Sequence, residues 1–163
     1  SGMPGAPKIY GNLRYEYAFI GDEHPGMVEW DQDKISIAVI DIEVGSENGF
    51  PDPYLANEPI TAICMEMLNG HTYVWGCGEY NNPDPENVTY HRCKDEWSLC
   101  KSFLNAWSWS HPDVLTGWNT KFFDVPYLIN RFRKLLGEDE AKRLSPWKYI
   151  NERKAIKIGR AHV

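Results

Sequence analysis

Three acidic residues stand where they could hold divalent metal ions. Asp41 and Glu43 end the apolar run 35–44, and Asp124 follows roughly eighty residues later. Successive side chains of a strand alternate between its faces, so Asp41 and Glu43 are predicted to project from the same face. Neighbouring carboxylates repel each other and are costly to desolvate, and a bound cation relieves both effects. Their hard oxygen ligands suit Mg²⁺ or Mn²⁺ rather than zinc.

The run 35–44 must form the strand that presents the first two acids. It consists of β-branched and other apolar residues with one polar residue before Asp41, which predicts a buried strand. Both acids then lie at its carboxyl end, where open α/β sheets tend to place ligands. An alternative stays open at this point: the two acids could simply extend from the strand end into solvent.

The third acid lies at a predicted junction between a turn and a helix. Residues 113–118 are predicted as a short strand, 119–123 as a turn, and Asp124 as the N-cap of a helix that Gly137 ends. The apolar face of this helix is formed by Val125, Leu128, Ile129, Phe132, Leu135 and Leu136. Alone, this segment allows Asp124 to be only an N-cap and Asn119 only a turn residue.

Together, the two segments resemble a known pair of motifs. Asp41-Ile-Glu43 followed by Asn119-x-x-x-Phe123-Asp124 is similar to the first two motifs of the 3'→5' proofreading exonuclease in family-B DNA polymerases. The likeness is closest to the polymerases of T-even-type bacteriophages. It extends from about residue 8 to the end and is carried by residues 41–44, 49–53, 116–119, 123–127, 136–138 and 143–146.

The resemblance implies a fold and a reaction. The fold would be a mixed α/β sheet of the RNase H-like exonuclease type, with element order β-β-β-α-β-α and the first strand central. The reaction would be two-metal hydrolysis of the last phosphodiester at the 3' end of single-stranded DNA. Asp41 would bridge both ions, Glu43 would hold the ion that carries the attacking water, and Asp124 would support the second ion. Asn119 would position the terminal sugar or phosphate.

One expected motif is missing. The family carries a Tyr-x-x-x-Asp downstream of the second motif, and none follows Asp124; the single such spacing, at residues 80–84, precedes it in a Pro/Asn-rich loop. The polymerase palm motifs are also absent. Ser1-Gly2 before Met3 resembles the remnant of a cleaved tag. We therefore expect a C-terminally truncated piece of a larger polymerase, with an incomplete metal site and little exonuclease activity by itself. It could instead be a non-catalytic scaffold that binds nucleic acid weakly.

Aromatic residues beside the acids are candidates for DNA contact. Phe50 lies in the loop 45–53, just beyond the first carboxylates, and an exposed ring there could stack on bases of any sequence. Phe50 could alternatively plug the core under the loop. Trp118 and Phe123 are expected mainly to pack, although Phe123 joins Phe50 and Asn119 among the candidate DNA contacts.

Composition indicates a single soluble domain. The chain has 163 residues, 42% of them apolar, with no signal peptide and no apolar run long enough to span a membrane. Four cysteines without Cys-x-x-Cys spacing argue against zinc and suggest free thiols. The resemblance places the chain as a monomer in the cytoplasm of a phage-infected bacterium, with the rest of the polymerase and a DNA 3' end as partners.

Charge is unevenly distributed along the chain. Residues 142–163 carry a net charge of +6 and the remainder carries −12. The basic segment could follow a DNA backbone or pack onto other parts of the polymerase. Both possibilities stay open.

The chain is predicted to have three parts. Residues 1–7 are a leader, residues 8–34 lead in from an N-terminal domain, with Tyr15, Tyr17 and Phe19 alternating as in a strand, and residues 35–163 form the partial exonuclease domain. Within the last part we expect strands at 60–68 and 72–75 joined by an Asn69-Gly70 hairpin turn, an extended piece at 88–91 and a helix at about 95–108.

Overall fold

The computed structural model describes residues 14–26, 29, 31–47 and 49–151. The chain divides into two compact units, Ser1–Lys34 and Ile35–Val163. Its helices and strands are, in chain order, α1 (Tyr15–Glu23), β1 (Ile37–Val44), β2 (Ile60–Met67), β3 (Thr72–Gly76), β4 (Val88–Arg92), α2 (Glu96–Ser110), β5 (Val114–Thr116), α3 (Asp124–Leu136) and α4 (Glu138–Ala141), with short 3-10 turns at Gln32–Lys34 and Lys142–Leu144.

The first unit contains helix α1, so the prediction of a strand at Tyr15, Tyr17 and Phe19 is wrong. All three side chains are exposed, and Ala18 is the buried residue of the helix. A strand must find a partner strand for its backbone N–H and C=O groups, whereas a helix pairs them locally. The alternating aromatic residues therefore carried no information about backbone conformation here.

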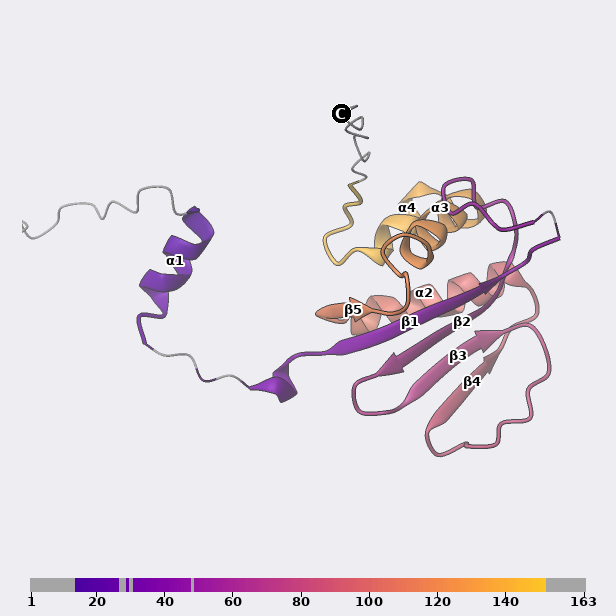
Figure 1. Cartoon of the computed structure of the whole chain (residues 1–163), viewed down its shortest axis with the longest axis horizontal. Helices are drawn as coiled ribbons and strands as arrows, with labels where there is room; N and C mark the ends of the chain where they lie inside the picture. Colours follow the sequence, from indigo (N-terminus) through magenta and orange to yellow (C-terminus); the bar gives the residue numbers. More distant parts are fainter. Residues whose placement is uncertain (1–13, 27–28, 30, 48, 152–163) are drawn as a thin grey trace, which may run out of the picture. The chain divides into compact units, whose positions relative to one another are not determined.

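The second unit is built on a five-stranded mixed sheet with strand order β4-β3-β2-β1-β5 (Figure 1). β2 is antiparallel to β1 and β3, whereas β1–β5 and β3–β4 are parallel pairs. The predicted hairpin is confirmed: the turn at Gly70, with φ +85°, joins β2 to β3. The piece at 88–91 forms a full strand, β4, so four strands rather than three precede the first helix of this unit. β1 lies inside the sheet, between β2 and β5.

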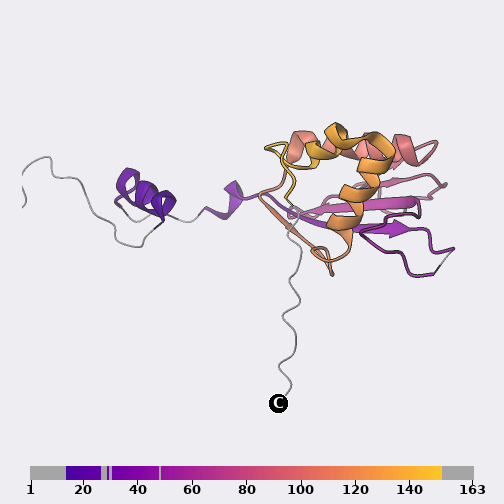
Figure 2. The ribbon, with the colours of Figure 1, turned by 90° about the horizontal axis from the view of Figure 1, so that it is seen from above.

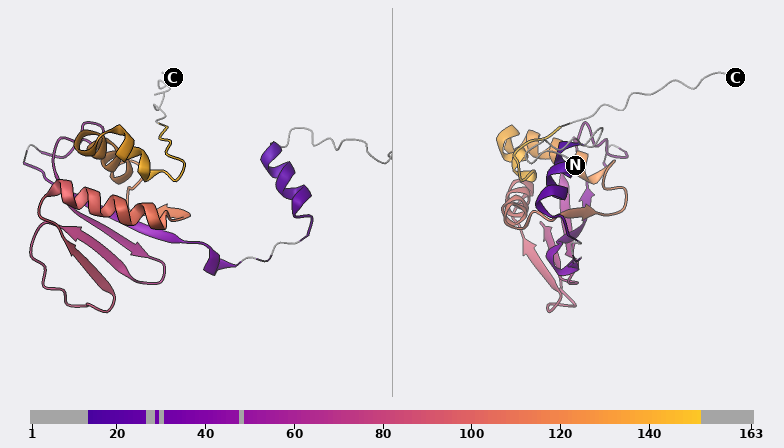
Figure 3. Two further views of the ribbon diagram at one scale, coloured as in Figure 1. Left: turned by 180° about the vertical axis from the view of Figure 1, so that it is seen from behind. Right: turned by 90° about the vertical axis from the view of Figure 1, so that its left-hand side faces the viewer.

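Helices cover one face of this sheet. In Figures 2 and 3, α2 and α3 lie on the same side of the strands, and no described helix of this unit lies on the other side. The burial of β1 alternates accordingly, with Ala38, Ile40 and Ile42 buried beneath the helices. The opposite face of β1 is exposed, and this face is available for a ligand.

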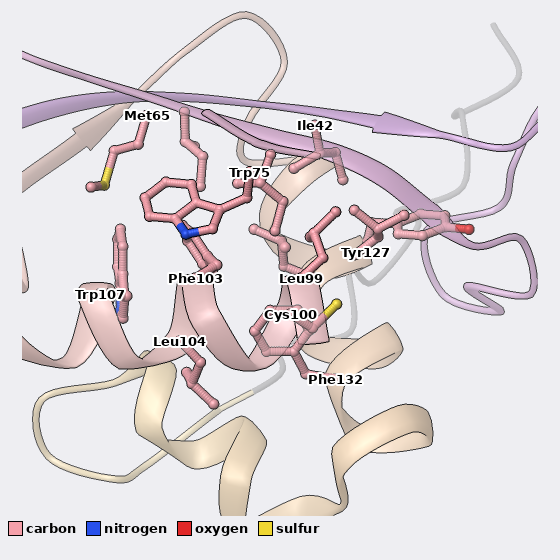
Figure 4. Packing of buried hydrophobic residues seen from close by; sticks show 14 of the residues in the cluster. Ile42, Met65, Trp75, Leu99, Cys100, Phe103, Leu104, Trp107, Tyr127 and Phe132 are labelled. Carbon is pink, nitrogen blue, oxygen red and sulfur yellow. The ribbon is translucent and has the colours of Figure 1, made fainter. Parts of the chain in front are cut away.

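The hydrophobic core fills the space between the sheet and the helices (Figure 4). Trp75 from β3 meets Phe103 of α2 edge to face, with ring centroids 5.2 Å apart. Phe103 contacts Phe132 of α3 in a second edge-to-face pair at 6.2 Å. Such aromatic pairs add to the free energy of burial. The core thus joins α2 and α3 to the sheet and fixes where α3 begins.

The predicted helix boundaries hold to within two residues. Asp95 caps α2, since its carboxylate accepts a hydrogen bond from the Ser98 N–H at 2.8 Å, and the Ser98 hydroxyl accepts the Asp95 N–H at 3.2 Å to complete a capping box. The helix continues to Ser110, two residues beyond the predicted end. Gly137, with φ +95°, ends α3 as predicted.

Candidate functional site

Asp41 and Glu43 lie on the sheet face that the helices leave open. Both residues are exposed and alternate with the buried Ile40 and Ile42, which confirms that the two acids share a face. Within the described residues neither carboxylate is paired with a lysine or arginine. The two negative charges are therefore available to a cation from solution.

Asp124 occupies a different environment, because it is only 2% exposed. Its carboxylate Oδ1 accepts a hydrogen bond from the Ile42 N–H of β1 at 3.2 Å. The predicted N-cap role is wrong: Asp124 is the first residue of α3, and the cap position is Phe123, whose side chain makes no capping bond. Among the described residues, the Ile42 N–H has no partner strand on the β5 side of β1. It donates its hydrogen bond to the Asp124 carboxylate, which therefore does not cap the helix.

The edge of β1 explains why this N–H is available. β5 pairs only with residues Ile37 to Val39 of β1, so the following residues have no partner strand on that side among those the structure describes. The turn after β5 fills the gap instead. A side chain on Gly117, which has φ +153°, would place its Cβ 2.4 Å from the Ile40 carbonyl oxygen. Only glycine allows the turn to approach β1 this closely, and the approach brings Asp124 to the strand.

Burial and a neighbouring charge both act on Asp124. Desolvation raises the pKa of its carboxyl, and the negative charge of Asp41 raises that pKa further. The hydrogen bond from the Ile42 N–H opposes these effects only in part. Asp124 and Asp41 are thus close enough to repel each other, and a cation between them would relieve that repulsion.

The carboxylate oxygens of these acids are suitable ligands for a hard divalent cation, but they are few. Among the residues described by the structure, no group of three or more His, Cys, Asp or Glu side chains is gathered as a metal site. Asp41 and Asp124 are brought together, and Glu43 lies two residues further along the same face of β1. Carboxylate oxygens suit Mg²⁺, which usually keeps several water ligands and so needs few from protein.

Two predicted DNA contacts, Phe50 and Phe123, touch each other. Their ring centroids are 5.5 Å apart, and Phe50 is 87% exposed, so the alternative that it plugs the core is wrong. Phe123 is partly buried against the core and also contacts Tyr127 at 5.5 Å. The exposed ring of Phe50 therefore rests against the packed ring of Phe123, the residue that precedes Asp124.

Trp118 differs from its prediction as a packing residue, because it is 93% exposed. It stands between Gly117 and Asn119, which both have positive φ, and this turn directs the indole away from the core. Asn119, with φ +57°, is also exposed, and its carbonyl accepts hydrogen bonds from the N–H groups of Phe122 and Phe123. The candidate site thus has a second exposed ring that the sequence pattern did not indicate.

Two further residues near the acids were missed. Thr120 is 7% exposed, and its hydroxyl has no hydrogen-bond partner among the described residues. Cys64 lies opposite Asp41 on β2, and its thiol pKa is raised by burial first and by the Asp41 charge second. Neither signal exists in the sequence, since both depend on contacts made across the fold.

A cavity of about 260 Å³ lies elsewhere, beneath the helices. Its walls include Ile40, Trp107, Leu115 and Leu128, and it contains no acidic side chain. It therefore belongs to the packing between helices and sheet, and the candidate site remains at the open face and edge of β1.

The comparison with known proteins agrees with this arrangement. Residues 16–161 match the family model of the exonuclease domain of family B DNA polymerases. The chain belongs to this family. The five-stranded mixed sheet is consistent with the RNase H-like fold of the exonuclease domain.

Individual relatives include phage and cellular polymerases. The DNA-directed DNA polymerase of Escherichia phage RB69 is 33% identical over 157 residues, which cover 81% of this chain and 17% of that protein. The polymerase of Enterobacteria phage T4 is 30% identical over the same coverage. The DNA polymerase delta catalytic subunit of Bos taurus is 30% identical over 128 residues, or 69% of this chain and 10% of that protein.

The chain thus spans less than a fifth of the length of these relatives. The match to the exonuclease domain confirms the resemblance that the two motifs suggested. None of the helices in the part of the chain that the structure describes is long and apolar enough to cross a membrane.

Proposed function

We propose that this exonuclease domain removes nucleotides from the 3' end of single-stranded DNA, as the proofreading part of a larger DNA polymerase. Water would add to the terminal phosphorus and the bond to the preceding 3' oxygen would break. The products would be a nucleoside 5'-monophosphate and a strand one nucleotide shorter, with a proton delivered to the leaving oxygen. The phage relatives support an infected bacterial cell as the place of action.

The observation that carries this proposal is the pairing of Asp124 with β1. A buried carboxylate, held by the Ile42 N–H beside Asp41, has no cation of its own among the described residues. Acids with perturbed pKa values and no internal partner gather at functional sites. Asp41 and Asp124 would hold Mg²⁺ or Mn²⁺ between them, and Glu43 would add a further ligand from the same face. Bound ions would stabilise the attacking and leaving oxygens.

Three further side chains would hold the DNA end. Phe50 would stack on a terminal base, with Phe123 supporting its ring from below. Stacking accepts every base, which a site for mispaired ends requires. The exposed amide of Asn119 would donate a hydrogen bond to the terminal sugar or phosphate.

This chain alone should be a poor exonuclease. Catalytic groups must be held to within about half an ångström, and the described residues gather no cluster of three metal-ligating side chains. No Tyr-x-x-x-Asp follows Asp124 to add a ligand and orient the water. The shortage of ligands also favours the alternative, a non-catalytic scaffold that contacts nucleic acid.

Calorimetric titration with Mn²⁺ and Mg²⁺ separates these possibilities. We expect weak binding by the wild type and none by Asp41→Ala. The matched control is Glu66→Gln, which removes an exposed carboxylate from the neighbouring strand β2 and should bind as the wild type does. Featureless titrations for all three proteins would refute the metal site and favour the scaffold.

Degradation of a 3'-labelled single strand then tests the reaction itself. We expect little turnover from this chain, and turnover once the chain is extended through a downstream Tyr-x-x-x-Asp. Robust turnover by the present chain that disappears in Asp41→Ala would show that the site is already complete. No turnover by the extended chain would contradict the proposed hydrolysis.

A further inference from the structure

The loop that carries Phe50 connects β1 to β2 and is held by one face of helix α3. Four polar side chains from successive turns of α3 bond to this loop: Tyr127, Asn130, Arg131 and Lys134. The Tyr127 hydroxyl donates to the Glu58 carbonyl at 2.7 Å and the Asn130 amide to the Pro53 carbonyl at 3.0 Å. In Figure 4 the hydroxyl oxygen of Tyr127 points away from the core cluster.

Arg131 makes the most extensive of these attachments. Its Nη1 donates to the carbonyls of Ala56 at 3.2 Å and Asn57 at 2.8 Å. Its Nε and Nη2 donate to the two carboxylate oxygens of Glu96 at 2.7 and 2.6 Å. Glu96 in turn accepts the Ile60 N–H at 2.7 Å. One guanidinium therefore ties the loop to the start of α2 and, through Glu96, to the start of β2.

The loop needs such support because part of it is strained. Ala56 has φ +41°, a conformation that costs a residue other than glycine free energy, and it is completely buried. Strain of this kind persists only where surrounding contacts impose it. The Ala56 carbonyl is one of the two that Arg131 binds, so the guanidinium acts at the strained residue itself.

The same helix also holds the other end of the loop. Phe50 packs on Phe123, and Phe123 packs on Tyr127, each pair at 5.5 Å. α3 therefore fixes three things together: Asp124 in its first turn, the aromatic contact of Phe50 beside it, and the polar attachments of residues 53–58 further along.

We propose that Arg131 is a positioning residue that places Phe50 relative to Asp124, so that the grip on a DNA 3' end depends on the Arg131–Glu96 pair. The DNA part of this inference rests on the proposed function. Within the described residues, the Arg131 guanidinium bonds to Glu96, Ala56 and Asn57 and not to the candidate metal ligands. Its loss should weaken DNA-end binding while leaving metal binding at Asp41 unchanged.

Hydrogen exchange measures the positioning without DNA. In Arg131→Gln we expect the amides of residues 52–60 to exchange at least about tenfold faster than in the wild type. The matched control is Arg143→Gln, which removes a partly buried arginine whose guanidinium bonds to Glu140 and Asn105 rather than to this loop. If Arg131→Gln fails to fold, Asn130→Ala removes a single attachment and should accelerate exchange in the same segment. Unchanged exchange there in a folded variant would overturn the inference.

Fluorescence of a single strand with 2-aminopurine at its 3' terminus measures the consequence. We expect Phe50→Ala and Arg131→Gln to bind this strand about five- to tenfold more weakly and to quench it less, while Arg143→Gln behaves as the wild type. Arg131→Lys should not rescue binding, because an ammonium cannot bridge a carboxylate and two carbonyls at once. Normal binding and quenching in Arg131→Gln despite faster exchange would overturn the inference. A wild type that binds no DNA would instead refute the proposed function, and hydrogen exchange would still decide the positioning role.

Discussion

Asp124 and Glu96 are both acids at the first position of a helix, and the fold treats them in opposite ways. Each accepts a hydrogen bond from a strand N–H, Ile42 in one case and Ile60 in the other. Glu96 also receives a bidentate ion pair from Arg131. Asp124 is the more buried of the two and has no such partner in the described part of the chain.

This difference separates a structural acid from a candidate functional one. The Glu96 charge is neutralised inside the fold, and the hydrogen bonding of the Arg131 guanidinium to the Glu96 carboxylate raises the pKa of Arg131 above its usual value. The Asp124 charge is opposed by burial and by Asp41, so the pKa of its carboxyl is raised instead. A buried charge without an internal partner is costly, and a ligand from outside can remove that cost.

The largest effect should follow from breaking the neutralised pair. Glu96→Gln leaves the Arg131 guanidinium half-buried without its counter-charge, and we expect the free energy of unfolding to fall by about 2–4 kcal/mol. Chemical denaturation measures this change. Glu140→Gln, which disturbs the more exposed contacts with Lys101 and Arg143, serves as the comparison and should cost less. Equal losses would show that Glu96 has no special structural role.

Displacing the turn that delivers Asp124 should have the next largest effect. In Gly117→Ala the new Cβ would meet the Ile40 carbonyl at 2.4 Å and the Thr120 hydroxyl at 2.3 Å. The turn must shift, and we expect a loss of about 1–3 kcal/mol in denaturation together with weaker Mn²⁺ binding. Gly78→Ala is the control, because a Cβ there meets nothing within 4 Å. A Gly117→Ala protein with normal stability and metal binding would refute the close approach.

Removing the unpaired charge should have a smaller effect of opposite sign. Asp124→Asn keeps an oxygen that can accept the Ile42 N–H and abolishes the repulsion by Asp41. We expect a small gain in stability without metal, smaller than the two losses above and seen as a higher Tm. Added Mn²⁺ should raise the Tm of the wild type but not of this variant. Destabilisation by Asp124→Asn in metal-free buffer would mean that the charge is satisfied within the fold.

The smallest expected effect is the change with pH in the stability gained by Asp124→Asn. The folded pKa of Asp124 lies above its unfolded value, so the folded state binds the proton more tightly. The wild type therefore loses stability as pH rises from the unfolded pKa through the folded one. The advantage of Asp124→Asn should be absent below the usual range of an aspartate and complete above the raised pKa. Thermal unfolding of both proteins across acidic pH measures it, and a constant difference would contradict the assigned shift.

Local patterns predicted much of the backbone. The β-branched run 35–44 became β1, Asn69-Gly70 became a hairpin turn, and Gly137 ended α3. Each of these depends on neighbours in sequence, such as alternation along a strand or a residue that tolerates positive φ. The strand predicted at residues 15–19 failed because alternation alone does not supply a partner strand.

The candidate site was predicted only in part. The shared face of Asp41 and Glu43 and the exposed ring of Phe50 were expected and found. The exposure of Trp118 was not, because an indole normally packs and only the backbone of its turn directs it outward. The roles of the candidate residues in metal and DNA binding stay predictions.

The sequence by itself determined which family this chain belongs to, since ordered motifs survive as residue types and spacings whatever the surrounding fold does. Only the tertiary structure decided which acids are neutralised internally. Asp124 and Ile42 are 82 residues apart in sequence, and Arg131 and Glu96 are 35 apart. The energy of a carboxylate depends on its burial and on charges within a few ångströms, and folding brings those together from distant segments.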